Sequence, residues 1–450
     1  MNRRNFLATT ATLGVLTPLG SAQSLGAAPG APARQGGGAP KAPAGSQSPL
    51  AGTPAVFAPA ADGFTVVTTL DAPALVRVQY GEAPADGQIP PEADDCAKLL
   101  NQTAASDGYG FVPHDDRVVQ IRVHGLRAGT RHLWRLVATP LGSADKAPRY
   151  SKVYSTRTLD PAAASTRFLV WNDTHDRAPT ICGLHNRSRL SAFAPGETPD
   201  FLLWNGDLCN NVNHRAQLPH LFVSPKDADL AGLPPVFVAR GNHDVRGIWS
   251  NKVPDYVAFP GNRPYYAFRS GPVAAIVLDT GEDKPDNHPS FGGVAAFEPL
   301  IREQAAWLDE VVLRPEFRDA PHRVVFCHIP LRWLKERKPD YSRHGYDDFS
   351  RRGREAWAGA LRRWGAQVVI SGHMHHAAKI PANNEWPFEQ IVGGGPALTG
   401  NPKGATLLRG YADARCLRLE IAALAEGGTG DNPLFHSEFA ARAWGSFFAL

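Results

Sequence analysis

The chain has 450 residues, too many for one average core, so we expect two or three domains. Hydrophobic residues make up 43% of the chain and charged residues 20%, which is typical of globular proteins and excludes a disordered or fibrous chain. The net charge of +4 gives no strong field, so we expect no nucleic-acid binding and local capture of any anionic substrate. Five scattered cysteines are unsuited to a disulfide framework in a chain of this size, and we expect mostly free thiols.

Residues 1–28 have the plan of an export signal. A short basic start precedes an apolar run from Phe6 to Leu19, and small residues follow. The run is too short and too rich in Ala and Thr for a transmembrane anchor. The pair Arg3 and Arg4, within Asn-Arg-Arg-Asn-Phe-Leu, resembles the bacterial twin-arginine signal, which exports folded, cofactor-loaded proteins; an ordinary export signal is the alternative. Both imply contact with the export machinery and a periplasmic or secreted mature protein.

Two segments of different composition follow. Residues 29–52 consist almost entirely of Ala, Gly, Pro, Ser and Gln, which cannot bury enough apolar area to offset the entropy of ordering, so they predict a disordered linker. Residues 53–158 carry apolar residues at alternate positions, for example over 64–68, 76–80 and 119–123. Short alternating runs separated by turn signals predict a small all-β sandwich.

The second half of this sandwich carries a family resemblance. Residues 118–137 read VVQIRVHGLRAGTRHLWRLV, with turns at Gly125 and Gly129. The stretch resembles the fibronectin-type-III-like domain that precedes the catalytic domain of purple acid phosphatases and their bacterial relatives. It differs at His132 and Trp134, where that family tends to have tyrosines. We expect the sandwich to be a spacer without chemistry of its own.

Beyond residue 165, short apolar runs alternate with helical stretches. Two stretches, 299–314 and 351–364, place apolar residues at helical spacing. This alternation of buried strands with helices predicts an α/β domain over residues 165–426. The strands are expected at 168–171, 201–204, 236–239, 274–278, 324–327 and 368–370.

Residues 427–450 are expected to form a C-terminal tail. Phe435, Phe439, Trp444 and Phe448 would lie near one face of a helix. Such a face could hold a membrane or a partner, but we favour packing back onto the protein.

Polar groups follow five of the expected strands. Taken singly, each has a plain structural explanation, because a Gly-Asp pair is usually a turn and a lone His before Pro is usually a core residue. Together they place three carboxylates, five histidines and an amide at one sheet edge, where open α/β sheets bind ligands. So many nitrogen and oxygen groups exceed the needs of one tetrahedral ion and predict two divalent ions with a bridging carboxylate. The five groups are Asn172-Asp173-Thr174-His175, Asn205-Gly206-Asp207, Gly241-Asn242-His243-Asp244, Cys327-His328-Ile329 and Gly372-His373-Met374-His375.

The order DxH, GD, GNHD, H, GHxH resembles the calcineurin-like metallophosphoesterase superfamily, over roughly residues 166–426. The resemblance implies a four-layer αββα sandwich, preceded here by the small all-β sandwich. It also implies two divalent ions, for which manganese, iron and zinc all remain open. The ligands that it implies are Asp173, His175, Asp207 and His375 for the first ion, and Asp207 as the bridge with Asn242, His328 and His373 for the second.

The resemblance assigns two further residues and sets one departure. His243 would lie over the substrate as a proton donor or transition-state contact, and Asp244 would orient its ring. Purple acid phosphatases have a tyrosinate ligand three positions after the bridging aspartate and no histidine in the first block. This chain has Asn210 at that position and His175 in the first block, so we expect neither the purple colour nor the ferric ion.

These residues predict an exported phosphoesterase. Two ions about 3.5–4 Å apart can share a hydroxide that attacks a phosphate ester, while an imidazole such as that of His243 assists the leaving group. Hydrolysis of a small phosphate monoester is the leading interpretation. Phosphodiester hydrolysis at the same site is the alternative, and a catalytically silent binding protein is the minor one.

Contacts to the substrate are less well defined by the sequence. Asn210, Arg177 and Arg240 are the candidates carried forward. The other candidates near the ligand groups are His185, Asn211, His214 and Arg246. Specificity would depend on loops such as 181–197, 212–233 and 281–299.

Overall fold

The computed structural model describes residues 48–84, 100–114, 117–190, 193, 197–332, 346–396, 404–424 and 431–445. All of them belong to one compact unit, Gln47–Leu450. The predicted export signal at 1–28 and most of the predicted linker at 29–52 lie outside the described residues. Within the described ranges, no helix is both long and apolar enough to cross a membrane.

The first eight strands form two layers, as the alternating pattern predicts. They are β1 (Leu50–Ala60), β2 (Gly63–Leu70), β3 (Ala74–Glu82), β4 (Leu100–Thr103), β5 (Val118–Val123), β6 (Arg131–Pro140), β7 (Arg149–Tyr150) and β8 (Tyr154–Arg157). β1, β2 and β5 lie in one sheet, and β3, β4, β6 and β7 lie in the other, with β8 paired to β6. Trp134 helps to fill the core of these strands, 4.7 Å from Tyr154 and 6.3 Å from Phe64 between ring centroids.

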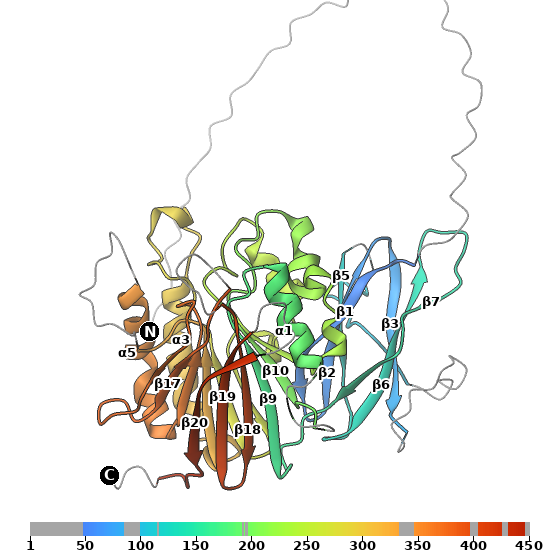
Figure 1. Cartoon of the computed structure of the whole chain (residues 1–450). Coiled ribbons are helices and arrows are strands. Elements are labelled where there is room, and N and C mark those ends of the chain that lie inside the picture. Colours follow the sequence, from blue (N-terminus) through green and yellow to red (C-terminus); the bar gives the residue numbers. More distant parts are fainter. Residues whose placement is uncertain are drawn as a thin grey trace, which may run out of the picture. The chain divides into compact units, whose positions relative to one another are not determined.

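One sheet runs through both parts of the chain. Its other strands are β9 (Ser165–Trp171), β10 (Phe201–Asn205), β11 (Val236–Ala239), β18 (Thr406–Asp413), β19 (Cys416–Leu424) and β20 (Asp431–Ala440). The order is β20-β19-β18-β9-β10-β11-β1-β2-β5, and β1 pairs in parallel with β11 at Phe57 and Val236. One layer of the β-sandwich is therefore continuous with the α/β sheet (Figure 1). The domain bounds at 53–158 and 165–426 remain predictions.

A second sheet of six strands packs against this one. In sheet order its strands are β12 (Tyr266–Ser270), β13 (Val273–Leu278), β14 (His322–Cys327), β15 (Val368–Ser371), β17 (Glu389–Val392) and β16 (Ala378–Ile380). The four central strands are parallel, and the two edge strands are antiparallel to their neighbours. Every residue of β13 and β14 is buried, as expected for parallel strands that are covered on both faces.

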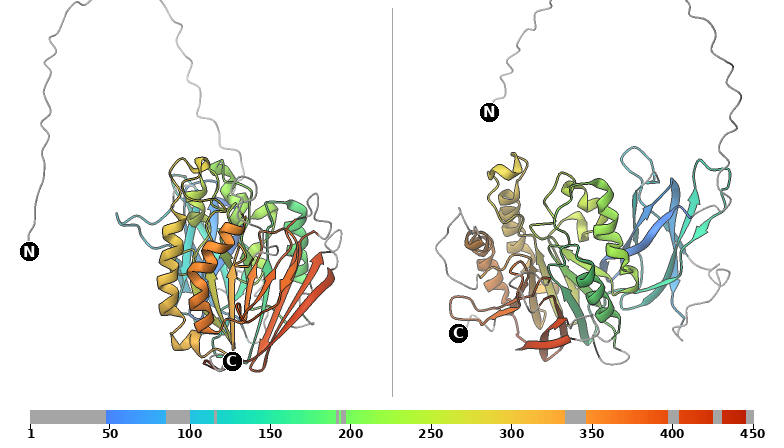
Figure 2. Two further views of the ribbon diagram at one scale, coloured as in Figure 1. Left: turned by 90° about the vertical axis from the view of Figure 1, so that its left-hand side faces the viewer. Right: turned by 45° about the horizontal axis from the view of Figure 1, so that its top comes forward.

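Helices cover the outer faces of the two sheets (Figure 2). They are α1 (Ala178–Leu190), α2 (Val253–Tyr256), α3 (Phe297–Val311), α4 (Pro315–Arg318) and α5 (Tyr346–Trp364). Short helical turns occur at Arg215–Gln217, Pro219–Val223, Pro225–Asp227, Leu230–Gly232, Ser250–Lys252, Pro260–Asn262 and Pro289–Phe291. Leu308 of α3 and Trp357 of α5 share a buried cluster with Val325 of the second sheet. Trp171 of the first sheet donates to Ser188 of α1 at 3.0 Å. The layers follow the predicted αββα order.

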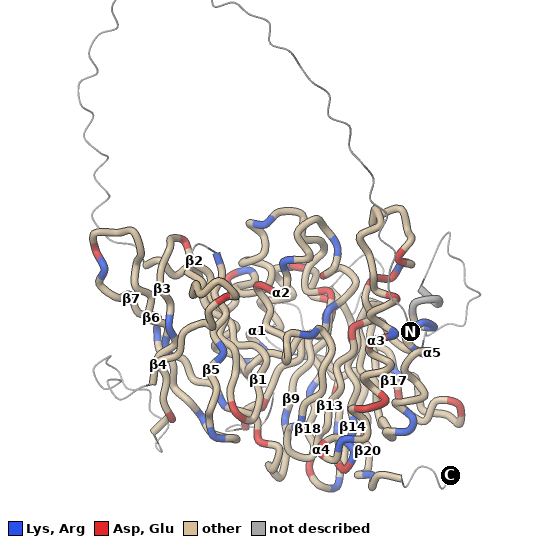
Figure 3. The backbone as a smooth tube through the Cα atoms, turned by 180° about the vertical axis from the view of Figure 1, so that it is seen from behind, with Lys and Arg blue, Asp and Glu red and all other residues tan. Residues whose placement is uncertain are grey.

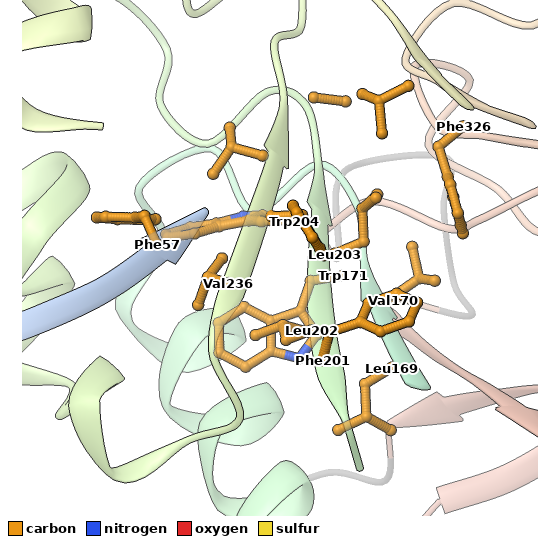
Figure 4. Packing of buried hydrophobic residues seen from close by; sticks show 14 of the residues in the cluster. Phe57, Leu169, Val170, Trp171, Phe201, Leu202, Leu203, Trp204, Val236 and Phe326 are labelled. Carbon is orange, nitrogen blue, oxygen red and sulfur yellow. The ribbon is translucent and has the colours of Figure 1, made fainter. Parts of the chain in front are cut away.

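Aromatic side chains fill the space between the two sheets. Phe168 of β9 stacks on Phe201 of β10 at 5.2 Å and meets Phe326 of β14 edge to face at 6.0 Å between centroids. On the other face of the first sheet, toward α1, Trp171 and Trp204 lie edge to face at 5.6 Å in the same cluster (Figure 4). Because Phe326 belongs to the second sheet, the rings of Phe168, Phe201 and Phe326 hold the two sheets together.

The C-terminal segment corrects one prediction. Residues 431–440 form a strand, β20, that pairs antiparallel with β19, where the sequence suggested a helix. The spacing of Phe435 and Phe439 suits both structures, because four residues span about one helical turn and also two strand repeats. Both rings pack against the core, so packing back onto the protein is confirmed for them. Trp444 is partly exposed beneath Arg318, and residue 448 lies outside the described residues.

Surface charge and thiols agree with the composition. Basic and acidic residues are interspersed along the backbone (Figure 3). The absence of nucleic-acid binding remains a prediction. Cys182, Cys209, Cys327 and Cys416 are free thiols, as expected, and Cys96 lies outside the described residues.

The inter-sheet rings give a stability prediction. Replacing Phe168, which is 0% exposed, with Ala should lower the free energy of unfolding by about 3–5 kcal/mol, because it leaves a cavity between the sheets. The matched control is Phe111→Ala at a 64% exposed site, with an expected change within about 0.5 kcal/mol. Chemical denaturation of both variants checks the difference. Equal effects would show that Phe168 does not join the sheets.

Candidate metal centre

Loops after β9, β10, β11, β14 and β15 bring the predicted ligands together. Two clusters form, and in each the ligand atoms lie within 4.8 Å of one another. The first cluster is Asp173, His175, Asp207 and His375, and the second is Asp207, His328 and His373. Asn242 adjoins the second cluster, since its Oδ1 lies 2.8 Å from Nδ1 of His373. Asp207 therefore belongs to both clusters, as the sequence predicts for a bridging ligand.

Two buried carboxylates lie at the centre of these clusters. Oδ2 of Asp207 is 3.1 Å from Nε2 of His328 and 3.4 Å from Nε2 of His175. Oδ1 of Asp173 is 3.6 Å from Nε2 of His375 and 3.9 Å from Nε2 of His328. Imidazole nitrogens from both sheets therefore surround the two carboxylates.

The ligand loops hold their residues in an uncommon backbone conformation. Five predicted ligands have φ between 48° and 70°: Asp173, His175, Asp207, His373 and His375. This left-handed region is costly for residues other than glycine, and it persists only where the surrounding structure holds it. Here neighbouring loops hold one another, since the N–H of Asp173 donates to the carbonyl of Gly206 at 3.1 Å and that of His175 to the carbonyl of Asp207 at 2.9 Å. Strain concentrated in this way is typical of functional sites.

Motif glycines lie directly against ligand side chains. A Cβ atom at Gly206 would overlap the ring of His328, and one at Gly372 would overlap the carboxylate of Asp173. Gly206 also has a φ of +84°. Only glycine combines this conformation with the missing side chain, which explains the glycine before Asp207.

Hydrogen bonds on the outer side of two rings aim them at the site. Nδ1 of His328 donates to the carbonyl of Asn205 at 3.0 Å, and Nδ1 of His175 donates to Oδ1 of Asn210 at 3.0 Å. In the neutral ring this leaves the lone pair on Nε2, which faces Asp207. Such outer partners fix the orientation of metal-binding histidines.

Burial and neighbouring charges shift the pKa values of the central groups strongly. Burial raises the pKa of Asp173 to about 8. Burial would also raise the pKa of Asp207, but His328 beside it holds that pKa well below its usual range. Burial would lower the pKa of His328, but Asp207 raises it to about 10. At neutral pH these shifts keep a proton, and with it a positive charge, on His328 between the two carboxylates. A bound metal ion would take the place of that proton.

The donor set fits a divalent cation. Oδ2 of Asp173 is buried and has no hydrogen-bond partner among the described residues, whereas Oδ1 accepts the N–H of His373 at 2.8 Å. A buried carboxylate oxygen without a donor is costly unless a cation or water neutralises it. Carboxylate, imidazole and amide groups are ligands that manganese, iron and zinc accept.

His243 lies next to the clusters, and its ring makes two hydrogen bonds. Nδ1 donates to the backbone carbonyl of Asn210 at 2.9 Å, and Nε2 accepts from Nη1 of Arg246 at 2.8 Å. The ring meets that of His175 edge to face, 4.8 Å between centroids. Burial lowers the pKa of His243, and Arg246 adds to this effect while Asp207 opposes it.

The contacts of Asp244 correct its predicted role. Its Oδ1 accepts the backbone N–H groups of Leu208 at 2.9 Å and Cys209 at 3.2 Å, and its Oδ2 accepts that of Gly241 at 2.8 Å. The carboxylate therefore joins the loop of Asp207 to the loop of Asn242. It does not hold the ring of His243, whose two nitrogens contact Asn210 and Arg246 instead.

The three candidate substrate contacts have different surroundings. Arg177 is exposed, and its charge acts on His375. Arg240 pairs through Nε with the buried carboxylate of Asp279 at 2.6 Å, so the structure gives it a partner other than the predicted substrate. Asn210 orients the rings of two histidines, as described above. Substrate contact by all three residues remains a prediction.

A cavity of about 460 Å³ adjoins the clusters. Its lining residues are Asp207, Asn242, His243, Arg246, Asp283, Lys284, His373, Met374, His375 and His376. Sequence reasoning missed Asp283 and Lys284, together with their buried neighbour Glu282. A signal was present, because the strand expected at 274–278 also ends in polar residues, and the rule used for five strands applies to this sixth one.

Comparisons with known proteins agree with this geometry. Residues 166–377 match the family model of the calcineurin-like phosphoesterases. This segment is therefore a calcineurin-like metallophosphoesterase domain, which confirms the resemblance drawn from the motifs. The match supports the prediction of a metal-dependent phosphoric ester hydrolase. It does not test the resemblance of residues 118–137 to a fibronectin-type-III-like domain.

The relatives and solved structures cover different shares of the chain. The protein called serine/threonine-protein phosphatase CPPED1 is 29% identical over 147 residues in both Homo sapiens and Pongo abelii, across 32% of this chain and 42% of the relative. The chain thus matches less than half the length of these relatives. Among solved structures, the match to the purple acid phosphatase PPD1 of yellow lupin (Lupinus luteus) covers 88% of this chain and 75% of the lupin chain, at 13% sequence identity and a TM-score of 0.59. The match to the structure of PhoD covers 89% of this chain and 92% of the PhoD chain, at 14% sequence identity and a TM-score of 0.58. These two structures share the fold.

The shared carboxylate gives a metal-binding prediction. Asp207→Asn should weaken metal binding about 100-fold or more, because it removes the charge common to both clusters. Metal content after dialysis, measured by mass spectrometry, checks this. The control is Asp255→Asn, which changes an exposed carboxylate of α2 and should bind metal like the wild type. Unchanged metal content in Asp207→Asn would refute the bridging role.

A pair of glycines separates backbone strain from contact with a ligand. Gly206 and Gly293 have nearly the same φ, +84° and +83°, but only Gly206 lies against another side chain within 4 Å. Gly206→Ala should lower metal affinity about 10-fold or more, because its Cβ displaces the ring of His328. Gly293→Ala should carry the backbone strain alone and keep the metal. Equal metal affinities would show that the contact with His328 is unimportant.

Proposed function

We propose that the chain is an exported metallophosphoesterase that hydrolyses small phosphate monoesters. The observation that carries the proposal is that Asp207 joins two ligand clusters beside a cavity of about 460 Å³. A cavity of this size suits a small molecule. Bound in the two clusters, a pair of divalent ions would supply a hydroxide nucleophile near neutral pH and a Lewis-acid hold on phosphate oxygens.

His243 is placed to act on the leaving group. Its ring lines the cavity, and Nδ1 is engaged with the carbonyl of Asn210. Nε2 is therefore the atom that would give a proton to the leaving oxygen. In the structure Nε2 accepts from Arg246. Because one lone pair cannot serve two hydrogens, Arg246 must release Nε2, which then takes up a proton from solvent before it gives one to the leaving oxygen.

The finer parts of the proposal rest on the sequence. We infer two ions of manganese, iron or zinc, and no ferric–tyrosinate pair, because Asn210 stands at the tyrosinate position. The twin-arginine-like start supports export to the periplasm or beyond. The likeness of residues 118–137 to purple acid phosphatases favours monoesters. Phosphodiester hydrolysis at the same ligands is the alternative.

A paired assay tests the reaction and the role of His243. The manganese-loaded protein should hydrolyse para-nitrophenyl phosphate faster than bis(para-nitrophenyl) phosphate. His243→Ala should lower kcat by about 10²- to 10⁴-fold, because the leaving oxygen loses its proton donor. Its metal content should equal that of the wild type. His124→Ala, at an exposed histidine that does not line the cavity, should keep full activity.

The other outcomes are equally informative. A preference for the diester would establish a phosphodiesterase and refute the monoester proposal. Metal binding without hydrolysis of either ester, under several metals, would support a binding protein. Loss of metal from His243→Ala would show that this residue is a ligand.

A further inference from the structure

Three neighbouring side chains hold Arg246 on the cavity wall. Its Nε donates to both carboxylate oxygens of Glu282, at 3.0 and 2.9 Å, and its Nη2 donates to Glu282 and to Asp283. Nη1 donates to Nε2 of His243. A guanidinium has five N–H groups, and these contacts use four. The second N–H of Nη1 has no hydrogen-bond partner among the described residues.

The charges around Arg246 are arranged in two layers. The side chain of Glu282 is 0% exposed and that of Asp283 is 10% exposed, whereas those of Arg246 and Lys284 are 21% and 34% exposed. Both cations line the cavity together with Asp283, and Glu282 does not. Lys284 contacts Asp283 and Glu282 through Nζ. The buried carboxylate therefore lies behind the cations and holds them toward the cavity.

The charges in this network depend on one another. Burial raises the pKa of Glu282 to about 7, and the hydrogen bonds from Arg246 oppose that rise. Burial would lower the pKa of Arg246, but its hydrogen bonds with Glu282 raise it, so the guanidinium stays charged. A buried ion pair is weak evidence for stability. The network is better explained by the need to fix a cation at one place in the cavity.

We propose that Arg246 is a specificity-determining residue that selects phosphate monoesters over diesters; this inference rests on the proposed function. A monoester has three terminal phosphoryl oxygens and nearly two negative charges at neutral pH. A diester has one terminal oxygen fewer and a single charge. The fixed guanidinium donates to the additional oxygen of the monoester in a charge-assisted hydrogen bond. A diester presents an esterified oxygen there and gains less.

This contact also explains how Nε2 of His243 can accept from Arg246 in the structure and still act as the proton donor in the reaction. When a phosphoryl oxygen accepts the N–H of Nη1 that now bonds Nε2, it releases Nε2 from Arg246. The ring keeps its orientation, because Nδ1 still donates to the carbonyl of Asn210. Binding of the monoester thus frees Nε2 to take up a proton from solvent, which it can then give to the leaving oxygen.

The test compares two esters and one anion in the metal-loaded protein. In Arg246→Met, kcat/KM for para-nitrophenyl phosphate should fall about 100-fold, while that for bis(para-nitrophenyl) phosphate should change less than about 3-fold. The inhibition constant of inorganic phosphate should rise about 10- to 100-fold. Glu282→Gln should lower kcat/KM for the monoester and raise the inhibition constant of phosphate, each by about 10-fold, because the guanidinium loses the charged carboxylate that positions it.

Matched variants separate this role from loss of structure or of any cation. Arg418→Met removes an arginine from an exposed pair with Glu438, and its ester and phosphate values should match those of the wild type. Arg246→Lys keeps the charge without the planar fork, so it should lie between the wild type and Arg246→Met. Metal content is measured for every variant and should equal that of the wild type.

The possible failures are distinguishable. Equal losses on both esters, or an unchanged phosphate constant, would overturn the role of Arg246 and leave the hydrolase proposal intact. A wild type that prefers the diester would also overturn it. If the wild type binds metal and hydrolyses neither ester, the proposed function fails, and calorimetry with inorganic phosphate then decides whether Arg246 contacts the anion; equal affinities of wild type and Arg246→Met would overturn that contact.

Discussion

The buried carboxylate of Asp207 is the constraint on which the site depends. It is almost fully enclosed, and its Oδ2 faces imidazole nitrogens from His328 and His175. Such a charge is stable away from water only if positive charge or donors surround it. The loops must therefore bring rings from two sheets to one point. The left-handed backbone of Asp207 and the bare Cα of Gly206 follow from this crowding.

The two sheets must therefore keep a fixed position relative to each other, and packing in the core holds them there. Phe168 and Phe326 join the sheets beneath the site. On the other side of β11, the strand before Asn242, the N-terminal strand β1 pairs at Phe57 and Val236. Without β1, the short β11 would be an edge strand with unpaired backbone groups. The β-sandwich thus completes the sheet that carries the GNHD loop, which is more than the spacer role expected from the sequence.

Local patterns predicted what depends on local sequence. Alternation and apolar runs located the strands, and polar residues after them located the two clusters of predicted ligands, because parallel strands end at one edge. Two features depended on distant partners and were misread. Asp244 follows His243, but its Oδ1 accepts amides of another loop and its Oδ2 accepts the amide of Gly241. The spacing of Phe435 and Phe439 fits a helix and a strand equally well, and only the neighbouring β19 decides between them.

The cavity wall, like the metal centre, is built from residues of both sheets. Arg246 lies two residues after the GNHD motif and is tied to it, since its backbone N–H donates to the carbonyl of His243 at 3.1 Å. Its partner Glu282 comes from the loop after β13, in the other sheet. The ion pair of Arg246 and Glu282 could not be predicted from the sequence, because 36 positions separate the two residues. The packing that sets the distance between the two sheets therefore positions both the predicted ligand clusters and Arg246, so the proposed chemistry and the proposed selectivity depend on the same packing.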